Sequence, residues 1–287
     1  MSGVTASVPF DRLKQSDFRR LAAFIERYSG IKMPPSKITM LEGRLRHRAR
    51  DTGARSLADY CRVLFNGDGL QSEAVHLIDA VTTNKTDFFR EPEHFRILVR
   101  QALPTLLADR HAGPQAQVKL WSAACSTGPE PYTLAMVLDD WRQQKPGQRF
   151  AILGTDLSTD ALETARRAIY PEAMVAVVPP DLRHRYLLRS RDRSRHLVRV
   201  VPELRSWVNF GRLNLMDSEY PVDRDHDVIF CRNVLIYFDK PTQHAVLQRL
   251  CRHLRPGGYL FLGHSESLAG MALPLRSVAN TVLRRPL

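Results

Sequence analysis

Cysteine is scarce in this chain of 287 residues, and its few copies are far apart. Zinc sites and disulfide frameworks depend on cysteines that are paired with each other or with histidine at short, regular spacing. No C-x-x-C pair occurs, and no nearby histidine has the spacing of a zinc ligand. We therefore expect no metal site and small buried thiols instead. The four cysteines are Cys61, Cys125, Cys231 and Cys251.

Long apolar runs are also missing. Residues 1–14 lack the continuous apolar segment of a signal peptide. No later stretch approaches the roughly 18 apolar residues that a membrane span needs. We expect a cytoplasmic protein without an inserted membrane segment.

Acidic residues are fewer than basic ones. The sequence has 30 Asp and Glu against 42 Lys and Arg, which gives a formal charge of +12 and a pI of about 10.0. Such an imbalance favours an anionic partner, which can be a nucleic acid, an anionic membrane surface or an acidic protein. Charge alone does not choose among these three.

The first part of the chain has helical periodicity. Ser16-Asp17 predicts an N-cap, and apolar residues follow at helical spacing until Gly30. A second helix is predicted after Pro34-Pro35, and two shorter ones over residues 57–64 and 73–81. We therefore expect an all-helical N-terminal domain over residues 10–90. The second helix carries an unusual excess of base over its one acid, Glu42, and its basic residues are Lys37, Arg44, Arg46, His47, Arg48 and Arg50.

From residue 91 the pattern changes to short apolar runs that alternate with helix-like segments. A long helix is predicted from Pro92 to a break at residues 111–114. The runs after it predict a doubly wound, Rossmann-like sheet covered by helices on both faces, over residues 91–287. Within this domain we expect an inserted antiparallel β-subdomain at about 178–206, a hairpin with an arginine-rich tip. The runs occupy residues 118–123, 150–154, 207–210, 227–230 and 259–262.

Polar residues stand where these strands end. Ligands of open α/β sheets lie outside the carboxyl ends of the strands, so Arg232, Asn233 and Tyr237, which follow the fourth run, are candidate site residues. Gly128 stands alone, not in a G-x-G-x-x-G fingerprint, and Glu130 would repel a pyrophosphate. Asp156 ends the second run, where such folds place a carboxylate for ribose hydroxyls. Glu130 suits a cationic group and Asp156 suits ribose hydroxyls. S-adenosylmethionine has an ammonium group and ribose hydroxyls but no phosphate, so it fits these two acids better than NAD does.

Four motifs, in order and spread over nearly the whole chain, closely resemble those of the CheR family, the chemotaxis receptor methyltransferases. They are residues 82–90 (TTNKTDFFR), 121–132 (WSAACSTGPEPY), 230–238 (FCRNVLIYF) and 263–267 (GHSES). The resemblance implies an enzyme that uses S-adenosylmethionine, releases S-adenosylhomocysteine, and forms methyl esters on glutamate side chains of chemoreceptors. One departure is Pro129-Glu130, where family members commonly carry two adjacent acids.

The resemblance also implies roles for individual residues. Arg90 and Tyr237 match the residues thought to act at the methyl transfer. The implied cofactor contacts are Asn84, Thr86, Arg90, Glu130, Asp156, Asn214, Leu215, Arg232 and Asn233.

The partner implied by the resemblance is the cytoplasmic part of a chemoreceptor, whose acidic methylation helices suit the basic second helix. Docking on a receptor's C-terminal pentapeptide stays open, because residues 190–196 contain three arginines and none of the glycines typical of members that bind it. We expect a monomer. A nucleic-acid methyltransferase remains an alternative, although the run after the fourth strand is not the Asn/Asp-Pro-Pro-Tyr/Phe type that holds a flipped base. A non-catalytic receptor-binding scaffold is the other alternative.

Overall fold

The structure is a computed structural model, and it describes residues 12–109, 117–266, 268 and 270–287. The chain divides between Thr83 and Asn84 into two compact units. The sequence analysis set this boundary at residue 90, but residues 84–90 make their contacts within the second unit. The amide of Phe89, for example, donates to Thr133 Oγ1 at 3.1 Å. The break predicted at residues 111–114 lies outside the described residues.

The first unit is all-helical, as predicted. Helix α1 ends at Gly30, which adopts the left-handed conformation (φ 72°) that terminates many helices. The predicted N-cap at Ser16-Asp17 is wrong: the helix begins at Gln15, and Lys14 caps it without a side-chain hydrogen bond. The helices of this unit are α1 (Gln15–Ser29), η1 (Pro35–Lys37), α2 (Ile38–Asp51), α3 (Leu57–Phe65) and α4 (Gly69–Val81).

The second unit contains a seven-stranded sheet in the order β6-β2-β1-β7-β8-β10-β9. The first five strands of this order are parallel, and β10 and β9 are antiparallel to their neighbours. The predicted doubly wound sheet is confirmed. The strands are β1 (Val118–Ala123), β2 (Phe150–Asp156), β6 (Val208–Arg212), β7 (His226–Cys231), β8 (Leu254–Leu262), β9 (Arg276–Ala279) and β10 (Val282–Arg284).

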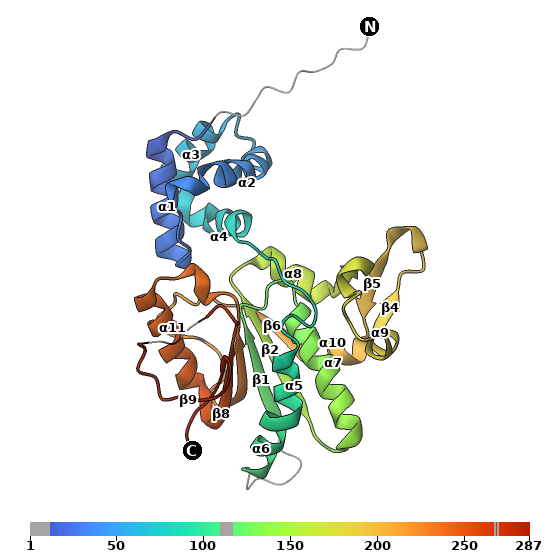
Figure 1. The fold of residues 1–287 in the computed structure, drawn as a ribbon. Coiled ribbons are helices and arrows are strands. Elements are labelled where there is room, and N and C mark those ends of the chain that lie inside the picture. The colour runs from blue at the N-terminus through green and yellow to red at the C-terminus, as the bar shows by residue number, and fades with distance from the viewer. Residues whose placement is uncertain (1–11, 110–116, 267, 269) are drawn as a thin grey trace. The chain divides into compact units, whose positions relative to one another are not determined.

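Helices cover both faces of this sheet (Figure 1). Strand side chains alternate between faces, so Val228 and Phe230 belong to one apolar cluster while Ile229 and Cys231 belong to the other. The first cluster includes side chains of α5 and α7, and the second includes those of α11. The helices around the sheet are α5 (Glu93–Ile97), η2 (Leu98–Ala102), α6 (Leu103–Ala108), α7 (Pro129–Gln144), α8 (Thr159–Arg167), α10 (Pro202–Arg205), η5 (Leu235–Tyr237) and α11 (Lys240–His253).

The helix predicted from Pro92 is formed by α5, η2 and α6 in succession. Its middle part, η2, is a π-helical turn. Pro104 lacks the amide that would continue the α-helical ladder, and the amide of Leu103 donates to the carbonyl of Leu98 instead.

A second, three-stranded antiparallel sheet has the order β3-β5-β4. Strands β4 and β5 form the predicted hairpin, with three-residue helix η4 at its arginine-rich tip. The subdomain begins earlier than residue 178, because β3 was not expected: it is three residues long and ends in proline. Its elements are β3 (Ile169–Pro171), η3 (Glu172–Val175), α9 (Pro180–Tyr186), β4 (Leu187–Arg189), η4 (Arg193–Arg195) and β5 (Leu197–Val200).

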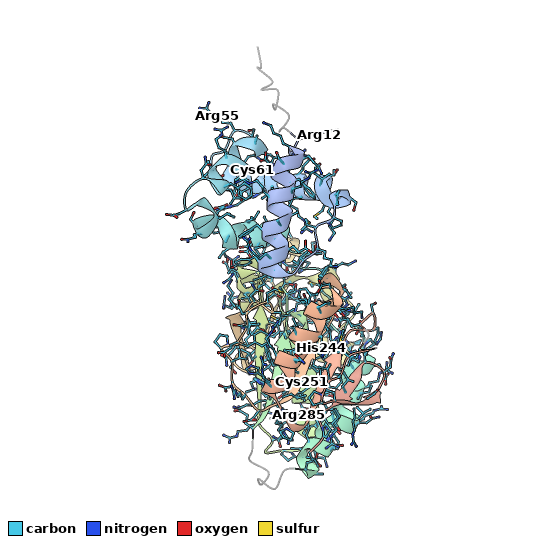
Figure 2. The ribbon with its side chains drawn as sticks, turned by 90° about the vertical axis from the view of Figure 1, so that its left-hand side faces the viewer. Arg12, Arg55, Cys61, His244, Cys251 and Arg285 are labelled. Atoms are coloured by element: carbon cyan, nitrogen blue, oxygen red, sulfur yellow. The ribbon has the colours of Figure 1, made fainter. Side chains whose placement is uncertain are left out.

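All four cysteines are free and buried, as predicted. Figure 2 shows Cys61 in the helical unit and Cys251 on α11. Burial raises the pKa of Cys61 to about 12 and that of Cys251 to about 11, so both thiols are protonated and unreactive at neutral pH.

Candidate functional site

The residues predicted to bind a ligand gather at one edge of the large sheet. Asp156 is the last residue of β2, and Arg232 and Asn233 directly follow β7. The turn that follows β1 lies between these strands' ends, because β1 pairs in parallel with both β2 and β7. The carboxyl ends of parallel strands meet at the same edge, where open α/β sheets bind ligands.

The turn between β1 and α7 is tightly folded. Ala124, Ser126 and Gly128 have positive φ angles of 61°, 52° and 96°. A Cβ added to Gly128 would lie 2.9 Å from both Ala165 Cβ and Tyr170 Oη, so only glycine fits this close approach. Three left-handed residues in five turn the backbone sharply and carry the chain from strand to helix at the ligand-binding edge.

Asp156 holds this turn in place. Its carboxylate accepts hydrogen bonds from the amide of Ser126 at 2.7 Å and from the amide of Ser158 at 2.9 Å. Asn84 contacts the same two serines: its carbonyl accepts from Ser126 Oγ at 3.1 Å, and its side-chain amide donates to Ser158 Oγ at 3.4 Å. The structure therefore brings Asn84 and Asp156 together through two serines.

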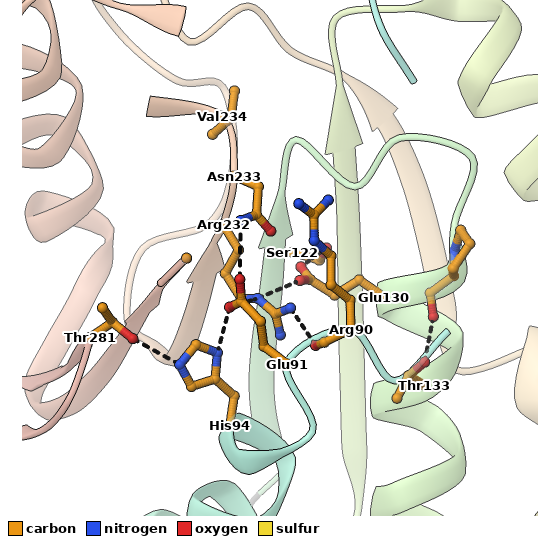
Figure 3. A network of polar contacts seen from close by, with 12 residues as sticks. Arg90, Glu91, His94, Ser122, Glu130, Thr133, Arg232, Asn233, Val234 and Thr281 are labelled. Atoms are coloured by element: carbon orange, nitrogen blue, oxygen red, sulfur yellow. Dashed lines mark hydrogen bonds and ion pairs between the residues drawn. The ribbon is translucent and has the colours of Figure 1, made fainter. Parts of the chain in front are cut away.

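Arg232 is a buried cation at the centre of the site (Figure 3). Its side chain is 2% exposed, and its Nε lies 3.4 Å from Glu130 Oε2 and 3.6 Å from Glu91 Oε2. Nη2 donates to the carbonyl oxygen of Arg90 at 2.5 Å. Among the described residues, Nε and Nη1 have no hydrogen-bond partner. The guanidinium is thus neutralised by two carboxylates but not fully hydrogen-bonded.

The pKa values of the two acids beside Arg232 are shifted in opposite directions. Burial raises the pKa of Glu130, although Arg232 and the hydroxyl of Ser122, which donates to Oε1 at 2.7 Å, oppose the rise. Burial also acts to raise the pKa of Glu91, but the hydrogen bond from Asn233 and the charge of Arg232 outweigh it and hold the pKa below its usual value. Glu91 is therefore the more firmly ionised of the two.

Arg90 lies between two residues of strained backbone. Phe89 and Glu91 have φ angles of 52° and 56°, a left-handed conformation that costs a side-chain-bearing residue about 1 kcal/mol. Among described residues, the guanidinium of Arg90 makes one long hydrogen bond, at 3.4 Å to the carbonyl of Lys85. Figure 3 shows its side chain on the same edge as Glu130 and Asn233. This guanidinium is half-buried, and most of its donor atoms make no hydrogen bond to a described residue.

The other predicted residues have local contacts. Asn214 accepts from the amide of Met216 at 3.0 Å, a turn-capping contact, and Leu215 is buried in the α11-side cluster. Tyr237 ends η5 and packs on that cluster, and its hydroxyl makes no hydrogen bond to a described residue. For Thr86, which is partly buried, no side-chain hydrogen bond to a described residue is found. No hydrogen bond or ion pair between described residues joins Thr86, Leu215 or Tyr237 to Arg232.

Sequence reasoning missed two acids. Glu91 directly follows the first motif, and its charge beside a predicted arginine was the available signal. Glu266 belongs to the fourth motif but received no role. Its buried carboxylate accepts from the amides of Val234 at 2.9 Å, Leu235 at 2.7 Å and Gly263 at 2.6 Å, and so fixes the loop that leads to Tyr237.

A doubly wound sheet with an acid at the end of its second strand and a buried cluster of charged side chains beside it is the arrangement of a nucleoside-binding, Rossmann-like α/β protein. Comparison with known families is specific. Residues 16–82 match the CheR methyltransferase all-alpha domain, and residues 84–283 match the CheR methyltransferase SAM binding domain. The chain belongs to the CheR methyltransferase family, and the cofactor predicted from the sequence, S-adenosylmethionine, is confirmed.

Similar curated proteins agree along nearly the whole length. The chain is 39% identical over 261 residues to the chemotaxis protein methyltransferase of Escherichia coli, which covers 90% of this chain and 87% of that protein. It is 37% identical over 269 residues to chemotaxis protein methyltransferase 2 of Pseudomonas aeruginosa, covering 93% and 92%. The relative from Borreliella burgdorferi is 34% identical over 259 residues and covers 90% of each chain. No helix in the described residues is long and apolar enough to cross a membrane.

Proposed function

We propose that this protein forms methyl esters on glutamate side chains of chemoreceptors, and that the residues at the carboxyl ends of β1, β2 and β7 hold S-adenosylmethionine for this reaction. Family membership and the names of the similar proteins support the first part. The second part is supported chiefly by one observation: a fully buried arginine, Arg232, has two donor atoms without hydrogen-bond partners among the described residues. A buried donor left unpaired costs about 1–3 kcal/mol, so a ligand acceptor placed there is strongly favoured.

The charged residues at this edge of the sheet are complementary to the charged and polar groups of the cofactor. Arg232 would bind the carboxylate of the cofactor's amino-acid part, and Glu130 its ammonium group. Asp156, at the end of β2, would accept hydrogen bonds from the ribose hydroxyls. Asn214 and Leu215 would offer an amide and an apolar wall to adenine. Further contacts from the N-terminal side and from β7 would be made by Asn84, Thr86, Arg90 and Asn233.

The reaction demands little from the protein beyond positioning. When bound, the cofactor supplies an electrophilic methyl group on a sulfonium. A glutamate side chain has an ordinary pKa of about 4.3 and is already ionised at neutral pH, so no general base is needed. The protein must hold the acceptor oxygen about 3 Å from the methyl carbon and in line with it.

Arg90 and Tyr237 are suited to that positioning. Arg90 would attract and orient the acceptor carboxylate, because its guanidinium has only one long hydrogen bond within the protein. Tyr237 would donate one hydrogen bond to the acceptor, since its hydroxyl is not used by a described residue. A single neutral donor fixes the direction of the lone pair without removing much of its nucleophilicity.

The partner surface is proposed on α2, where the sequence places its excess of base. Two of the basic residues of α2 form contacts within the helical unit. Arg44 donates to the carbonyl of Thr82 at 2.7 Å, and Arg48 pairs with Glu73 at 2.5 Å. Arg46, His47 and Arg50 remain partly or fully exposed. They would meet the acidic methylation helices of a receptor in the cytoplasm, with the enzyme acting as a monomer.

The reaction is tested with labelled S-adenosylmethionine and two substrates, a receptor cytoplasmic fragment and total RNA. Label that enters the receptor and is released by mild alkali identifies a carboxyl methyl ester and supports the proposal. Label in RNA that resists alkali, or no label in either substrate, would overturn it.

The cofactor site is tested by calorimetry with S-adenosylhomocysteine. Arg232→Gln is expected to weaken binding at least about tenfold, because a charge-assisted hydrogen bond contributes roughly 1.5–3 kcal/mol. Arg252→Gln, an exposed position on α11, is the matched control and should bind as the wild type does. Unchanged affinity in the Arg232 variant would remove this residue from the site.

A further inference from the structure

We propose that Glu91 is a positioning residue for cofactor binding: its carboxylate holds Arg232 and Asn233 in the orientation that receives the cofactor. This inference rests on the proposed role of those two residues as cofactor contacts. The sequence motifs assigned nothing to Glu91, and its importance appears only when the contacts of its two oxygens are followed.

Glu91 joins three segments that are distant in the chain. Oε1 accepts from the side-chain amide of Asn233 at 3.1 Å and from the backbone amide of His264 at 3.3 Å. Oε2 lies 3.6 Å from Arg232 Nε. The side chain is 12% exposed. One carboxylate therefore ties the residues after β7 and the loop after β8 to the segment that carries Arg90.

The backbone of Glu91 is bent to reach this position. Its φ of 56° is left-handed, a conformation that favours glycine and asparagine over glutamate. Such a conformation persists when surrounding contacts compensate for it. The hydrogen bonds to Asn233 and His264 and the charge of Arg232 supply that compensation, so the strain and the contacts belong to the same arrangement.

The imidazole of His94 lies beside the carboxylate of Glu91. Its Nδ1 lies 3.4 Å from Glu91 Oε2, and its Nε2 shares a hydrogen bond with Thr281 Oγ1 at 2.9 Å (Figure 3). Burial and the nearby charge of Arg232 lower the pKa of His94 to about 4, so the ring is neutral at physiological pH. A neutral ring leaves the charge of Glu91 to be balanced by Arg232.

The same cluster has the composition of a metal site, but the charges oppose that assignment. Ligand atoms of Glu91, His94 and His264 lie within 4.8 Å of one another. The oxygen nearest to His94 is also the one that faces Arg232, so a divalent cation would lie against a buried guanidinium. The cluster is therefore better explained as a network that orients Arg232.

The test uses Glu91→Gln, which keeps the shape and loses the charge. We expect the Kd for S-adenosylhomocysteine and the KM for S-adenosylmethionine to rise about tenfold, as for other residues that orient a ligand-binding group. The kcat at saturating cofactor should stay within about threefold of the wild type. Glu93→Gln is the matched control, because Glu93 is exposed and its one ion pair among the described residues is with Arg96. A fall in kcat with unchanged KM would overturn the proposal.

A double-mutant cycle separates this inference from the proposed cofactor site. If Glu91 acts through Arg232, then Glu91→Gln should cost little further affinity in a chain that already carries Arg232→Gln. Additive losses would overturn the inference while leaving the cofactor site intact. If Arg232→Gln itself bound normally, the proposed cofactor site would fail.

A second variant guards against a folding defect. Glu91→Asp keeps the charge but is shorter by one methylene, so it should lose less affinity than Glu91→Gln. Equal losses in the two variants, at equal thermal stability, would contradict the charge-based role.

Discussion

Arg232 donates a hydrogen bond from Nη2 to the backbone carbonyl of Arg90, which lies 142 positions earlier in the chain, at 2.5 Å. This contact links the residue proposed to anchor the cofactor to the residue proposed to orient the methyl acceptor. Because the acceptor atom is a backbone carbonyl, the link constrains the main chain at Arg90 and leaves its guanidinium free to bind the substrate. The proposed cofactor contact and the proposed acceptor contact are therefore joined through one hydrogen bond to the main chain.

Tyr237→Phe tests whether Tyr237 aligns the methyl acceptor without contributing to cofactor binding. The substitution removes one hydroxyl that has no hydrogen bond to a described residue and keeps the ring that packs on the α11-side cluster. We expect kcat to fall about 10- to 100-fold, because a hydrogen bond to a charged group contributes roughly 1.5–3 kcal/mol. Affinity for S-adenosylhomocysteine, measured by calorimetry, should not change. Normal turnover combined with weakened cofactor binding would refute the assignment.

Gly263→Ala tests the close packing between the β8 loop and Asn233. A Cβ at Gly263 would lie 2.5 Å from the side-chain nitrogen of Asn233 and 2.8 Å from its backbone nitrogen, so Asn233 must move. We expect a loss of about 1–3 kcal/mol in unfolding free energy, typical of overpacking, together with weaker S-adenosylhomocysteine binding.

Gly43 provides the control for that substitution. It lies inside α2, and a Cβ there would meet no atom within 4 Å. Gly43→Ala should therefore stabilise the protein by about 0.5–1 kcal/mol through the helix backbone, with unchanged cofactor affinity. If both alanine variants behaved alike in denaturant unfolding and calorimetry, the packing argument at Gly263 would be wrong.

His94 predicts a specific dependence of stability on pH. Its pKa is about 4 in the folded protein and about 6.5 when unfolded, so between these values the unfolded state binds more protons. Stability is then fully present above pH 6.5 and falls as the pH drops toward 4, by up to about 3 kcal/mol for this group. The facing groups are Glu91, Arg232 and His264, and the lowered pKa of Glu91 adds a loss of the same sign at acidic pH.

The measurement is denaturant unfolding at several pH values. His94→Gln should be less stable than the wild type at pH 7 but should show a flatter decline between pH 6.5 and 4. His196→Gln is the control, because His196 is 77% exposed and should keep the wild-type slope. An unchanged slope in the His94 variant would contradict the prediction.

The parts of the fold with regular periodicity could be predicted from the sequence. The spacing of Ile38, Leu41 and Leu45 indicated α2, and the apolar run before Arg232 indicated β7. Strand β3 could not be predicted in this way, because three residues ending in Pro171 carry no alternation, and the strand exists only through pairing with β5.

In the candidate site, too, local patterns could be predicted and long-range contacts could not. The positions of Arg232 and Asp156 at the ligand-binding edge were predictable because both residues stand where a predicted strand ends. The charge of Glu91 beside Arg90 was a local signal, but its contacts could not be predicted, because Asn233 and His264 lie 142 and 173 positions further along the chain. The N-cap predicted at Ser16-Asp17 shows the reverse error: suitable capping residues occur there, yet the helix already begins at Gln15.

Receptor docking can be tested by reversing charge on α2. Arg46 and Arg50 are chosen because Arg44 and Arg48 are needed within the helical unit, and the contact of Arg46 with Glu42, at 3.9 Å, is weak. Arg46→Glu combined with Arg50→Glu should raise the KM for a receptor fragment and flatten its increase with salt, because attraction between exposed charges is screened by ions. Turnover at saturating receptor and affinity for S-adenosylhomocysteine should remain near the wild-type values.

The matched control is the same charge change on another helix of the unit, Arg19→Glu with Arg27→Glu on α1, both of which are exposed. If docking uses α2, this control should shift the KM for receptor much less than the α2 variant at equal thermal stability. Equal shifts would mean that net charge steers association without a defined face, since long-range attraction depends on the total field. No shift in either variant would exclude the helical unit as the site of receptor recognition and leave the arginine-rich hairpin between β4 and β5 as the surface to alter next.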